Sequence, residues 1–387
     1  MTEISKAANR IYGEAAFEVL AKAQELERLG KDILHFEIGE PDIETPKNIA
    51  KAGIQAIKEK KTHYVPSIGI IELRKAIQDE VEKTRGYRPA LNQVIITPGL
   101  KPGIFFSMLA IVNPKDEVIF QDPGYPTYGS VTSFIGAKGI LVPLLEENEF
   151  RMNPDDIKKK ITEKTKLLIV NSPQNPTGSV MTKSELESIA ELAEEHNFFV
   201  VSDEIYSKMT YDTKHCSVTS YDGAKKRTIL LDGFSKYYAM TGWRLGYMIV
   251  PPKLADRLSD FLVSAVSCTA AFTQWAGLEA LKGNQSFIVT MMKRFREKRD
   301  KIVTGLNSIK NFSCLSPKGA FYAFPNIKKT GMSSQECANF LLNKGGIAAL
   351  PGTAFGPYGE GYLRFSYATT LENIDKAIAR MEDLFRR

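Results

Sequence analysis

Cysteine and histidine are scarce in this chain of 387 residues, with only four of each. The cysteines, Cys216, Cys268, Cys314 and Cys337, lie far apart and form no CxxC pair, so we expect free thiols in a reducing compartment. The histidines show neither HxxxH nor HExxH spacing. We therefore expect no metal site built from protein ligands.

Long apolar runs and repeats are also absent from the sequence. No run reaches the roughly 20 residues that a membrane-spanning helix needs. The first residues, MTEISK, lack the apolar core of a signal peptide. We find no low-complexity tract and no segment that resembles a linker. From these absences we expect a cytoplasmic protein that has no contact with a membrane.

Charge of one sign is only in modest excess. The chain has 51 Lys and Arg against 45 Asp and Glu, which gives a formal net charge of +6. The basic residues alternate with acidic ones, as in 155–163, so we expect a solvated surface and no nucleic-acid partner. Hydrophobic residues make up 43% and charged residues 25%, an ordinary globular mixture. This length suggests two domains.

Short apolar runs in the middle of the chain alternate with amphipathic stretches. They are mostly apolar without alternation, as in strands that are buried on both faces of a parallel sheet. The runs are 94–97, 117–120, 167–170, 198–201 and 229–231. Between them, 184–196 has apolar residues at helical spacing. The alternation predicts an α/β fold with a mostly parallel central sheet in a large domain, residues 46–285.

The two ends of the chain have a different pattern. Residues 14–30 predict one amphipathic helix that ends at Gly30, and residues 286–310 predict a long, charged helix. Further short strands and helices are predicted at 320–324, 362–367, 333–344 and 371–386. We expect both ends, 1–45 and 286–387, to form one smaller α+β domain.

Polar and aromatic residues gather directly after the predicted strands. Five loops have this character: 97–101, 122–126, 171–178, 202–206 and 232–236. In open α/β sheets, ligands bind beyond the carboxyl ends of the strands. Five such loops at one edge therefore predict a ligand site there.

The residue types in these loops indicate the ligand. Gly99, at a predicted helix start, leaves backbone N–H groups free for a phosphate, and Arg244 can add a bidentate contact. Asp203 can pair with a ring N–H⁺, and Tyr125 can stack on a flat ring. Lys236 can act as a nucleophilic amine. A phosphate, a ring nitrogen and a lysine-reactive aldehyde together describe pyridoxal 5'-phosphate (PLP).

Several longer motifs carry a family resemblance. They are SKYYAMTGWRLGY at 235–247, NSPQNPTG at 171–178, SDEIY at 202–206, GEPD at 39–42, LRFSY at 363–367, and YVPSIG at 64–69 followed by ELR at 72–74. In this order and over almost the whole chain, they resemble the class I/II aminotransferases of PLP fold type I. The prokaryotic aspartate-aminotransferase-like branch is the most similar.

The resemblance implies roles around the cofactor ring. Lys236 binds PLP covalently and shuttles the reacting proton. Asp203 keeps the pyridine nitrogen protonated, so that the ring takes up electrons. Asn175 and Tyr206 hydrogen-bond the 3-oxygen of the ring, and Tyr125 stacks on it. Lys236, Asp203 and Tyr206 are thus the expected catalytic residues.

The resemblance also implies which residues surround the cofactor phosphate: Gly99, Leu100, Lys101, Ser235 and Arg244. The chain departs from the family three positions before the lysine, because many relatives have serine where this chain has Gly233. We therefore expect the phosphate to depend more on backbone amides, Ser235 and Arg244.

For the substrate, the resemblance implies that Arg364 grips the α-carboxylate as a fork-to-fork pair. Gly39 and Asn175 line the same site, and Gly39 allows the small domain to close over the carboxylate. Tyr64 reaches the phosphate of the neighbouring subunit's cofactor, so the active unit is expected to be a homodimer.

The implied reaction is a ping-pong transamination between an amino acid and a 2-oxo acid, as part of amino-acid metabolism. Other PLP reactions, such as carbon–sulfur β-elimination, and a non-enzymatic binding module are the alternatives. Lys101 stands where some aspartate-using relatives bind the distal carboxylate, which favours aspartate as donor and 2-oxoglutarate as acceptor. It can equally be a residue of the phosphate loop, so alanine or aromatic donors remain alternatives.

Overall fold

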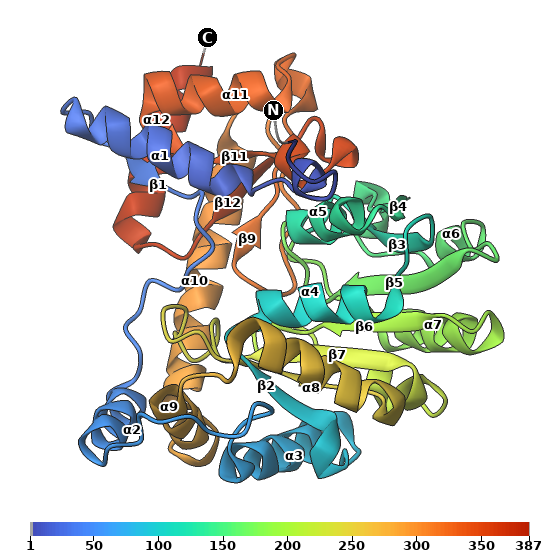
Figure 1. The fold of residues 1–387 in the computed structure, drawn as a ribbon. Coiled ribbons are helices and arrows are strands. Elements are labelled where there is room, and N and C mark those ends of the chain that lie inside the picture. The colour runs from blue at the N-terminus through green and yellow to red at the C-terminus, as the bar shows by residue number, and fades with distance from the viewer. Residues whose placement is uncertain (1–2, 387) are drawn as a thin grey trace.

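A computed structural model of the chain describes residues 3–386 and contains a central sheet of seven strands (Figure 1). Three residues lie outside the described part: Met1, Thr2 and Arg387. The first two begin the segment where we expect no signal peptide, and Arg387 ends the predicted small domain. The strands are β2 (Val94–Thr97), β3 (Glu117–Asp122), β4 (Lys138–Pro143), β5 (Thr165–Asn171), β6 (Phe199–Asp203), β7 (Thr228–Gly233) and β8 (Gly246–Ile249). Their spatial order is β2-β8-β7-β6-β5-β3-β4.

The sheet is mostly parallel, as expected. Only β8 runs against its neighbours β2 and β7, whereas β3 to β7 pair in parallel. All five predicted strands are confirmed. The sequence reasoning missed β4 and β8, whose patterns are weaker because each begins at or next to a glycine.

Helices cover both faces of the sheet. Helices α4 (Leu100–Ile111), α5 (Pro126–Ile135) and α8 (Pro252–Val266) lie on one face, and α3 (Ile71–Arg85), α6 (Pro154–Lys158) and α7 (Lys183–Glu195) on the other. Along β5, Leu167 and Ile169 pack in the core under α4, α5 and α8. Leu168 and Val170 pack in the core on the opposite face, under α6 and α7. Because both faces are buried, the strand is apolar without alternation. Helix α2 (Lys47–Lys58) packs against α9 (Ala271–Lys282), which contacts α3.

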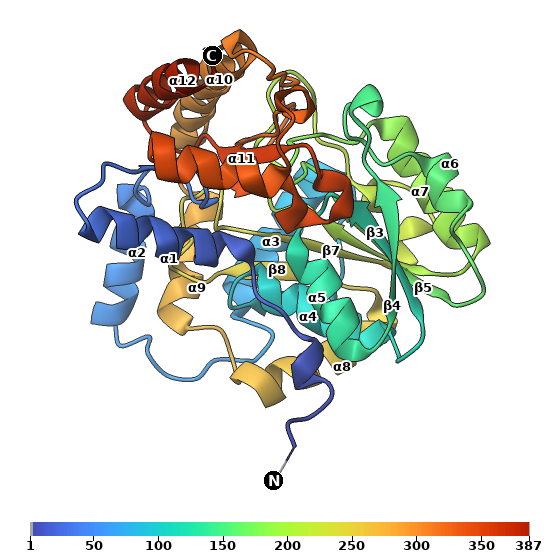
Figure 2. The ribbon, with the colours of Figure 1, turned by 90° about the horizontal axis from the view of Figure 1, so that it is seen from above.

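The two chain ends meet in space: their helices lie above the sheet in Figure 1 and in front of it in Figure 2, which is seen from above. After α1 (Ala15–Arg28), strand β1 (Leu34–His35) pairs in parallel with β10 (Ile347–Ala348). An antiparallel sheet, β11-β12-β9, joins β11 (Leu350–Pro351), β12 (Leu363–Ser366) and β9 (Tyr322–Ala323). The division of the chain at residues 46 and 285 stays a prediction.

The helices of the C-terminal end follow the sequence patterns closely. Helix α10 (Ser286–Ser308) packs against α12 (Leu371–Phe385). Helix α11 (Ser334–Phe340) continues into a π-helical turn at Leu341–Gly345, which accounts for the predicted helix at 333–344. None of the helices within residues 3–386 is both long enough and apolar enough to span a membrane.

Candidate active site

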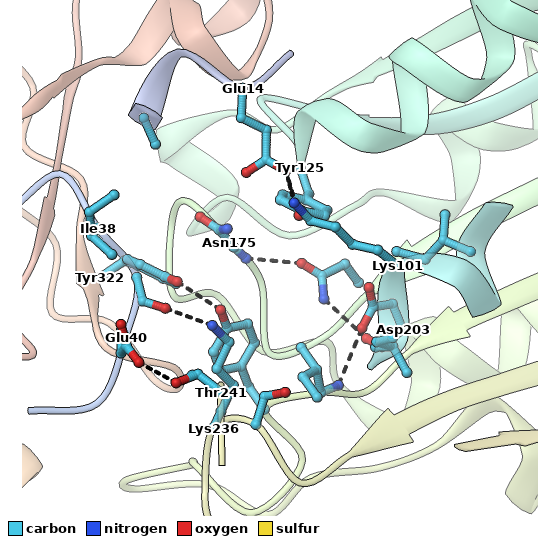
Figure 3. A pocket seen from close by; sticks show the side chains of 18 of the residues that line it. Glu14, Ile38, Glu40, Lys101, Tyr125, Asn175, Asp203, Lys236, Thr241 and Tyr322 are labelled. Carbon is cyan, nitrogen blue, oxygen red and sulfur yellow. Dashed lines mark hydrogen bonds and ion pairs between the residues drawn. The ribbon is translucent and has the colours of Figure 1, made fainter. Parts of the chain in front are cut away.

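A cavity of about 300 Å³ lies at the carboxyl ends of the parallel strands, where the chain ends cover the sheet (Figure 3). Most of the site residues expected from the sequence line it: Gly39, Leu100, Lys101, Tyr125, Asn175, Asp203, Tyr206, Ser235, Lys236, Arg244 and Arg364. Each of the five strand-end loops contributes at least one of them. The five strand-end loops therefore line one cavity.

Lys236 follows β7 and directs its amine into the cavity (Figure 3). Its Nζ donates a hydrogen bond of 2.6 Å to the carbonyl oxygen of Gly39. Desolvation lowers the pKa of Lys236 to about 8, and the positive charges of Arg364 and Arg244 act in the same direction, against Glu40. A larger fraction of neutral amine is present near pH 7 than for an ordinary lysine, as a nucleophile or base requires.

Asp203 ends β6 and is buried against the cavity. Its Oδ2 accepts a hydrogen bond of 2.7 Å from Tyr128 Oη, and its Oδ1 accepts one of 3.3 Å from the Ile205 amide. Burial raises the pKa of Asp203 to about 6, although the Tyr128 hydrogen bond lowers it. No basic side chain within residues 3–386 pairs with this carboxylate. A cationic ligand group would supply the missing partner.

Two asparagines connect the end of β6 to the chain ends. Asn171 Nδ2 donates to the Asp203 carbonyl at 3.0 Å, and Asn171 Oδ1 accepts from the Asn175 amide at 3.0 Å. Asn175 Oδ1 in turn accepts a hydrogen bond of 3.1 Å from Arg364 Nη1. Asn175 is therefore fixed between the sheet edge and β12.

Arg364, on β12, is buried with an exposed fraction of 4%. Its guanidinium lies 4.6 Å from the ring centroid of Tyr322 and 4.9 Å from that of Phe355. Its Nη2 donates to the Glu37 carbonyl, whereas its Nε has no hydrogen-bond partner. In the part of the chain that the structure describes, no carboxylate forms an ion pair with it. A buried cation of this kind fits a ligand carboxylate.

The expected phosphate end lies at the start of α4. Gly99 precedes this helix with φ of 82°, and a Cβ there would lie 2.2 Å from Arg244 Nη2, so only glycine fits. Arg244 Nη1 donates to the Thr241 carbonyl at 2.7 Å. The first amides of the helix, those of Leu100 and Lys101, have no intrahelical acceptor and are available to an anion.

Gly233 is explained by the approach of two strands. It stands opposite Gly246 in the β7–β8 ladder. A Cβ at Gly233 would lie 3.0 Å from the Gly246 Cα and 3.2 Å from the Leu245 carbonyl oxygen. A Cβ here would therefore be tight against backbone and would need a small shift of the β7–β8 pair.

Tyr322 and Tyr128 contact predicted site residues but were missed by the sequence reasoning. Tyr322 Oη lies 2.7 Å from Tyr206 Oη. A Cβ at Gly39 would lie only 2.1 Å from Tyr322 Oη, so Tyr322 is also the reason for the glycine. As single tyrosines outside the strand-end loops or on a helix, neither gave a signal that distinguishes it from core packing.

Glu14 is a third cavity residue that the sequence reasoning missed, and it lies just before α1. Its Oε1 forms an ion pair with Lys101 Nζ at 2.5 Å and accepts a hydrogen bond of 2.8 Å from Tyr125 Oη (Figure 3). An acidic residue at a helix start is an ordinary sequence feature, because it complements the helix dipole. Lys101, for which two roles were open, is therefore engaged by a carboxylate of its own chain.

Tyr64 lies apart from this cavity. It is 88% exposed and is not among the residues that line the site of its own chain. Its contribution to a neighbouring subunit stays a prediction.

The residues present fit PLP. Lys236 offers a partly neutral amine, Asp203 a buried carboxylate without a cation, and α4 an open N-terminus beside Arg244. These three features match the aldehyde, the ring nitrogen and the phosphate of that group.

Comparison with known proteins gives a consistent result. The family model described as aminotransferase class I and II matches residues 31–381. The chain is 41% identical to an aspartate aminotransferase from Pyrococcus abyssi, over 92% of each chain. It is 39% identical to aromatic-amino-acid aminotransferase 2 from Thermococcus litoralis, also over 92% of each. The solved structure of aspartate aminotransferase from Thermus thermophilus with maleate superposes with a TM-score of 0.95 at 35% identity, covering 99% of this chain and 100% of that one.

Proposed function

The chain belongs to the class I and II aminotransferases, and from this membership we propose that it transfers the amino group of L-aspartate to 2-oxoglutarate by a ping-pong reaction. The fold is PLP fold type I, and the cofactor is pyridoxal 5'-phosphate. Its relationship to proteins named aspartate aminotransferase supports the choice of donor, as does Lys101 in the cavity wall.

One observation carries the proposal: the amine of Lys236, the carboxylate of Asp203 and the guanidinium of Arg364 face one cavity. PLP, when bound, supplies an aldehyde that bonds to amines and a ring that takes up electrons from the substrate α-carbon. The residues proposed to hold it are Asp203 at the ring nitrogen, Asn175 and Tyr206 at the 3-oxygen, Tyr125 on the ring face, and Gly99, Leu100, Lys101, Ser235 and Arg244 at the phosphate.

The chain's own residues then have three tasks. Arg364 binds the substrate α-carboxylate and orients the α-carbon. The Nζ of Lys236 accepts the α-proton, for which its lowered pKa of about 8 is suited. The Gly39 carbonyl, which accepts a hydrogen bond from that Nζ, orients the amine.

We also propose that the protein is a cytoplasmic homodimer that acts in amino-acid biosynthesis. The exposed Tyr64 is then contributed to the cofactor phosphate of the partner. The large domain comprises 46–285, and the small domain comprises 1–45 with 286–387. The parallel pairing of β1 with β10 supports a small domain made from both ends.

Reductive trapping tests the assignment of Lys236. Borohydride treatment of the PLP-loaded protein, followed by digestion and mass spectrometry, should place a pyridoxyl adduct on the peptide that spans 233–244. A Lys236→Ala variant should lose the adduct, while Lys101→Ala, a matched change in the same cavity, should keep it. Absence of the adduct from this peptide, or an equal adduct on it in Lys236→Ala, would refute the role of Lys236.

A panel of amino donors with 2-oxoglutarate tests the substrate. Aspartate should give the highest kcat/KM, with oxaloacetate as product. The alternative is an aromatic donor, which is favoured by the relative from Thermococcus litoralis and by Phe17 and Ile38 in the cavity wall. Negligible turnover of aspartate beside rapid turnover of phenylalanine would establish that alternative, and release of pyruvate and ammonia would indicate a β-lyase.

A further inference from the structure

One wall of the cavity carries an ion pair between Lys101 and Glu14, and Glu14 has no part in the proposed chemistry. Glu14 and Phe17 from the N-terminal segment and Lys101 from α4 form this wall. Arg364, on β12, and Lys236, after β7, line other parts of the cavity. Lys236 is labelled in Figure 3. With the α-carboxylate at Arg364 and the amino group near Lys236, the wall around Lys101 is left to receive the substrate side chain.

The contacts of Glu14 place its charge directly on Lys101. A single oxygen, Oε1, forms the ion pair with Lys101 Nζ at 2.5 Å and accepts hydrogen bonds from Tyr125 Oη at 2.8 Å and Thr127 Oγ1 at 3.4 Å. The other oxygen of the carboxylate has no hydrogen-bond partner within residues 3–386. Lys101 therefore already has an intramolecular carboxylate in the place where a distal substrate carboxylate would bind.

We infer that Glu14 determines specificity by competing with the substrate for Lys101. A dicarboxylic substrate must displace Glu14 from Lys101, whereas a substrate with a neutral side chain binds while the Glu14–Lys101 pair stays intact. The inference deepens the proposed function and rests on it, because it concerns the side-chain selectivity of the same site.

The pair has the properties of an exchangeable contact. The side chain of Lys101 is 49% exposed and that of Glu14 is 20% exposed, and ion pairs near solvent are weak. Glu14 lies outside α1, in an extended conformation with φ of −98° and ψ of 127°. Its side chain can therefore turn away without loss of any hydrogen bond of the helix.

The intact pair also leaves a wall that suits neutral side chains. Lys101 Nζ lies 5.8 Å from the ring centroid of Phe17 and 5.9 Å from that of Tyr125. With its charge compensated by Glu14, this wall offers aromatic surface and no net charge. One pocket can then accept both an acidic and an uncharged side chain, so an aromatic donor, the alternative named above, could share the site with 2-oxoglutarate.

Binding of unreactive acids tests the inference without turnover. Succinate and butyrate have the same carbon number and differ in one carboxylate. Calorimetric Kd values for both are measured on the PLP-loaded wild type, on Glu14→Gln, which keeps size and polarity, and on Glu18→Gln. Glu18 is an exposed glutamate in the first turn of α1, four residues after Glu14, and serves as the matched control.

In Glu14→Gln, the ratio of Kd for butyrate to Kd for succinate should rise about fivefold, the strength of a solvent-accessible ion pair. In Glu18→Gln the ratio should stay at the wild-type value. In a Lys101→Ala background, Glu14→Gln should no longer change the ratio, because the amine for which Glu14 and the distal carboxylate of succinate compete is absent.

An unchanged or lower ratio in Glu14→Gln would overturn the inference, and so would an equal rise in the Lys101→Ala background. Its failure is distinguishable from that of the proposed function. If aspartate is turned over but the ratio does not respond to Glu14→Gln, only the inference fails. If the ratio shifts but no amino acid is turned over, the proposed reaction fails.

Discussion

Asp203 and Glu204 are neighbours at the end of β6, yet their carboxylates lie in opposite surroundings. Asp203 faces the cavity without a basic partner, and burial raises its pKa to about 6. Burial by itself would also raise the pKa of Glu204. Its contacts with Arg85 and His215 outweigh this effect and lower the pKa of Glu204 to about 2. Glu204 Oε2 lies 2.9 Å from Arg85 Nη2 and 2.8 Å from His215 Nε2.

The region around Glu204 is a completed network of buried charge. Arg85 also pairs with Asp232 at 2.7 Å, and Asp232 accepts hydrogen bonds from Ser207 and Tyr237. In the cavity, by contrast, neither Asp203 nor Arg364 has an oppositely charged partner among residues 3–386. The difference shows that the charges of the Glu204 network are compensated within the chain, whereas those of Asp203 and Arg364 in the cavity are left for ligand groups of opposite charge.

The largest effect that tests this comparison is expected for Asp203→Asn. Removing the carboxylate should lower kcat/KM about 10²–10³-fold, the size of one lost electrostatic contact in an enclosed site. It should not destabilise the cofactor-free protein, because the lost charge had no cationic partner. Steady-state kinetics and urea unfolding measure the two quantities, and a large loss of stability would contradict the comparison.

The pH dependence of stability sharpens the same prediction. Because the pKa of Asp203 is about 6 when folded and 3.8 ordinarily, the folded chain binds more protons than the unfolded chain between these values. The free energy of unfolding attributable to Asp203 should therefore fall as pH rises from about 4 to 6. In cofactor-free Asp203→Asn this contribution should be missing. Identical pH profiles for variant and wild type would refute the assignment.

Glu204→Gln should, in contrast to Asp203→Asn, lower the free energy of unfolding, and the pH dependence should have the opposite sign. Breaking a buried ion pair should cost about 3 kcal/mol of unfolding free energy, since Arg85 loses one of its two partners. The contribution of Glu204 should be present above its ordinary pKa of 4.5 and lost as pH falls toward 2. Urea unfolding measures the loss. The control, Glu372→Gln, removes an exposed pair with Lys376 and should leave the unfolding midpoint unchanged.

The smallest effect is expected for Tyr128→Phe, which removes the hydrogen bond to Asp203 Oδ2. The pKa of Asp203 should rise further, because this bond favours the charged form. PLP should then bind about tenfold more weakly, the usual cost of a hydrogen bond to a charged group. Absorbance titration of the cofactor-free protein measures Kd. Tyr358→Phe, a change at a half-exposed tyrosine outside the cavity, is the control, and equal Kd values in both variants would contradict the prediction.

Much of the fold was predictable because buried strands have a local signature. The five continuous apolar runs became β2, β3, β5, β6 and β7. Strand β4 escaped because it is an edge strand whose first residues, Lys138 and Gly139, are exposed. Strand β8 was missed because it begins at Gly246 and so lacks an apolar first residue. The close approach of Gly233 in the neighbouring strand favours glycine at that position.

The candidate site was predictable to the extent that its residues follow strands. Asn175, Asp203 and Lys236 could be placed together because parallel strands end at a common edge. Glu14 could not be placed, since its contact with Tyr125 joins residues 111 positions apart. The contact of Tyr322 with Tyr206 spans 116 positions and also involves no local pattern.

The sequence by itself determined the α/β architecture, the edge at which the site lies and the amine that the chemistry needs, because these follow from periodicity and from short motifs. Only the tertiary structure decided which charges are compensated: Glu204 by Arg85, Lys101 by Glu14, and neither Asp203 nor Arg364 by any basic or acidic side chain of residues 3–386. The reason is that ion pairing depends on distances of a few ångströms between distant segments, and these are set by packing.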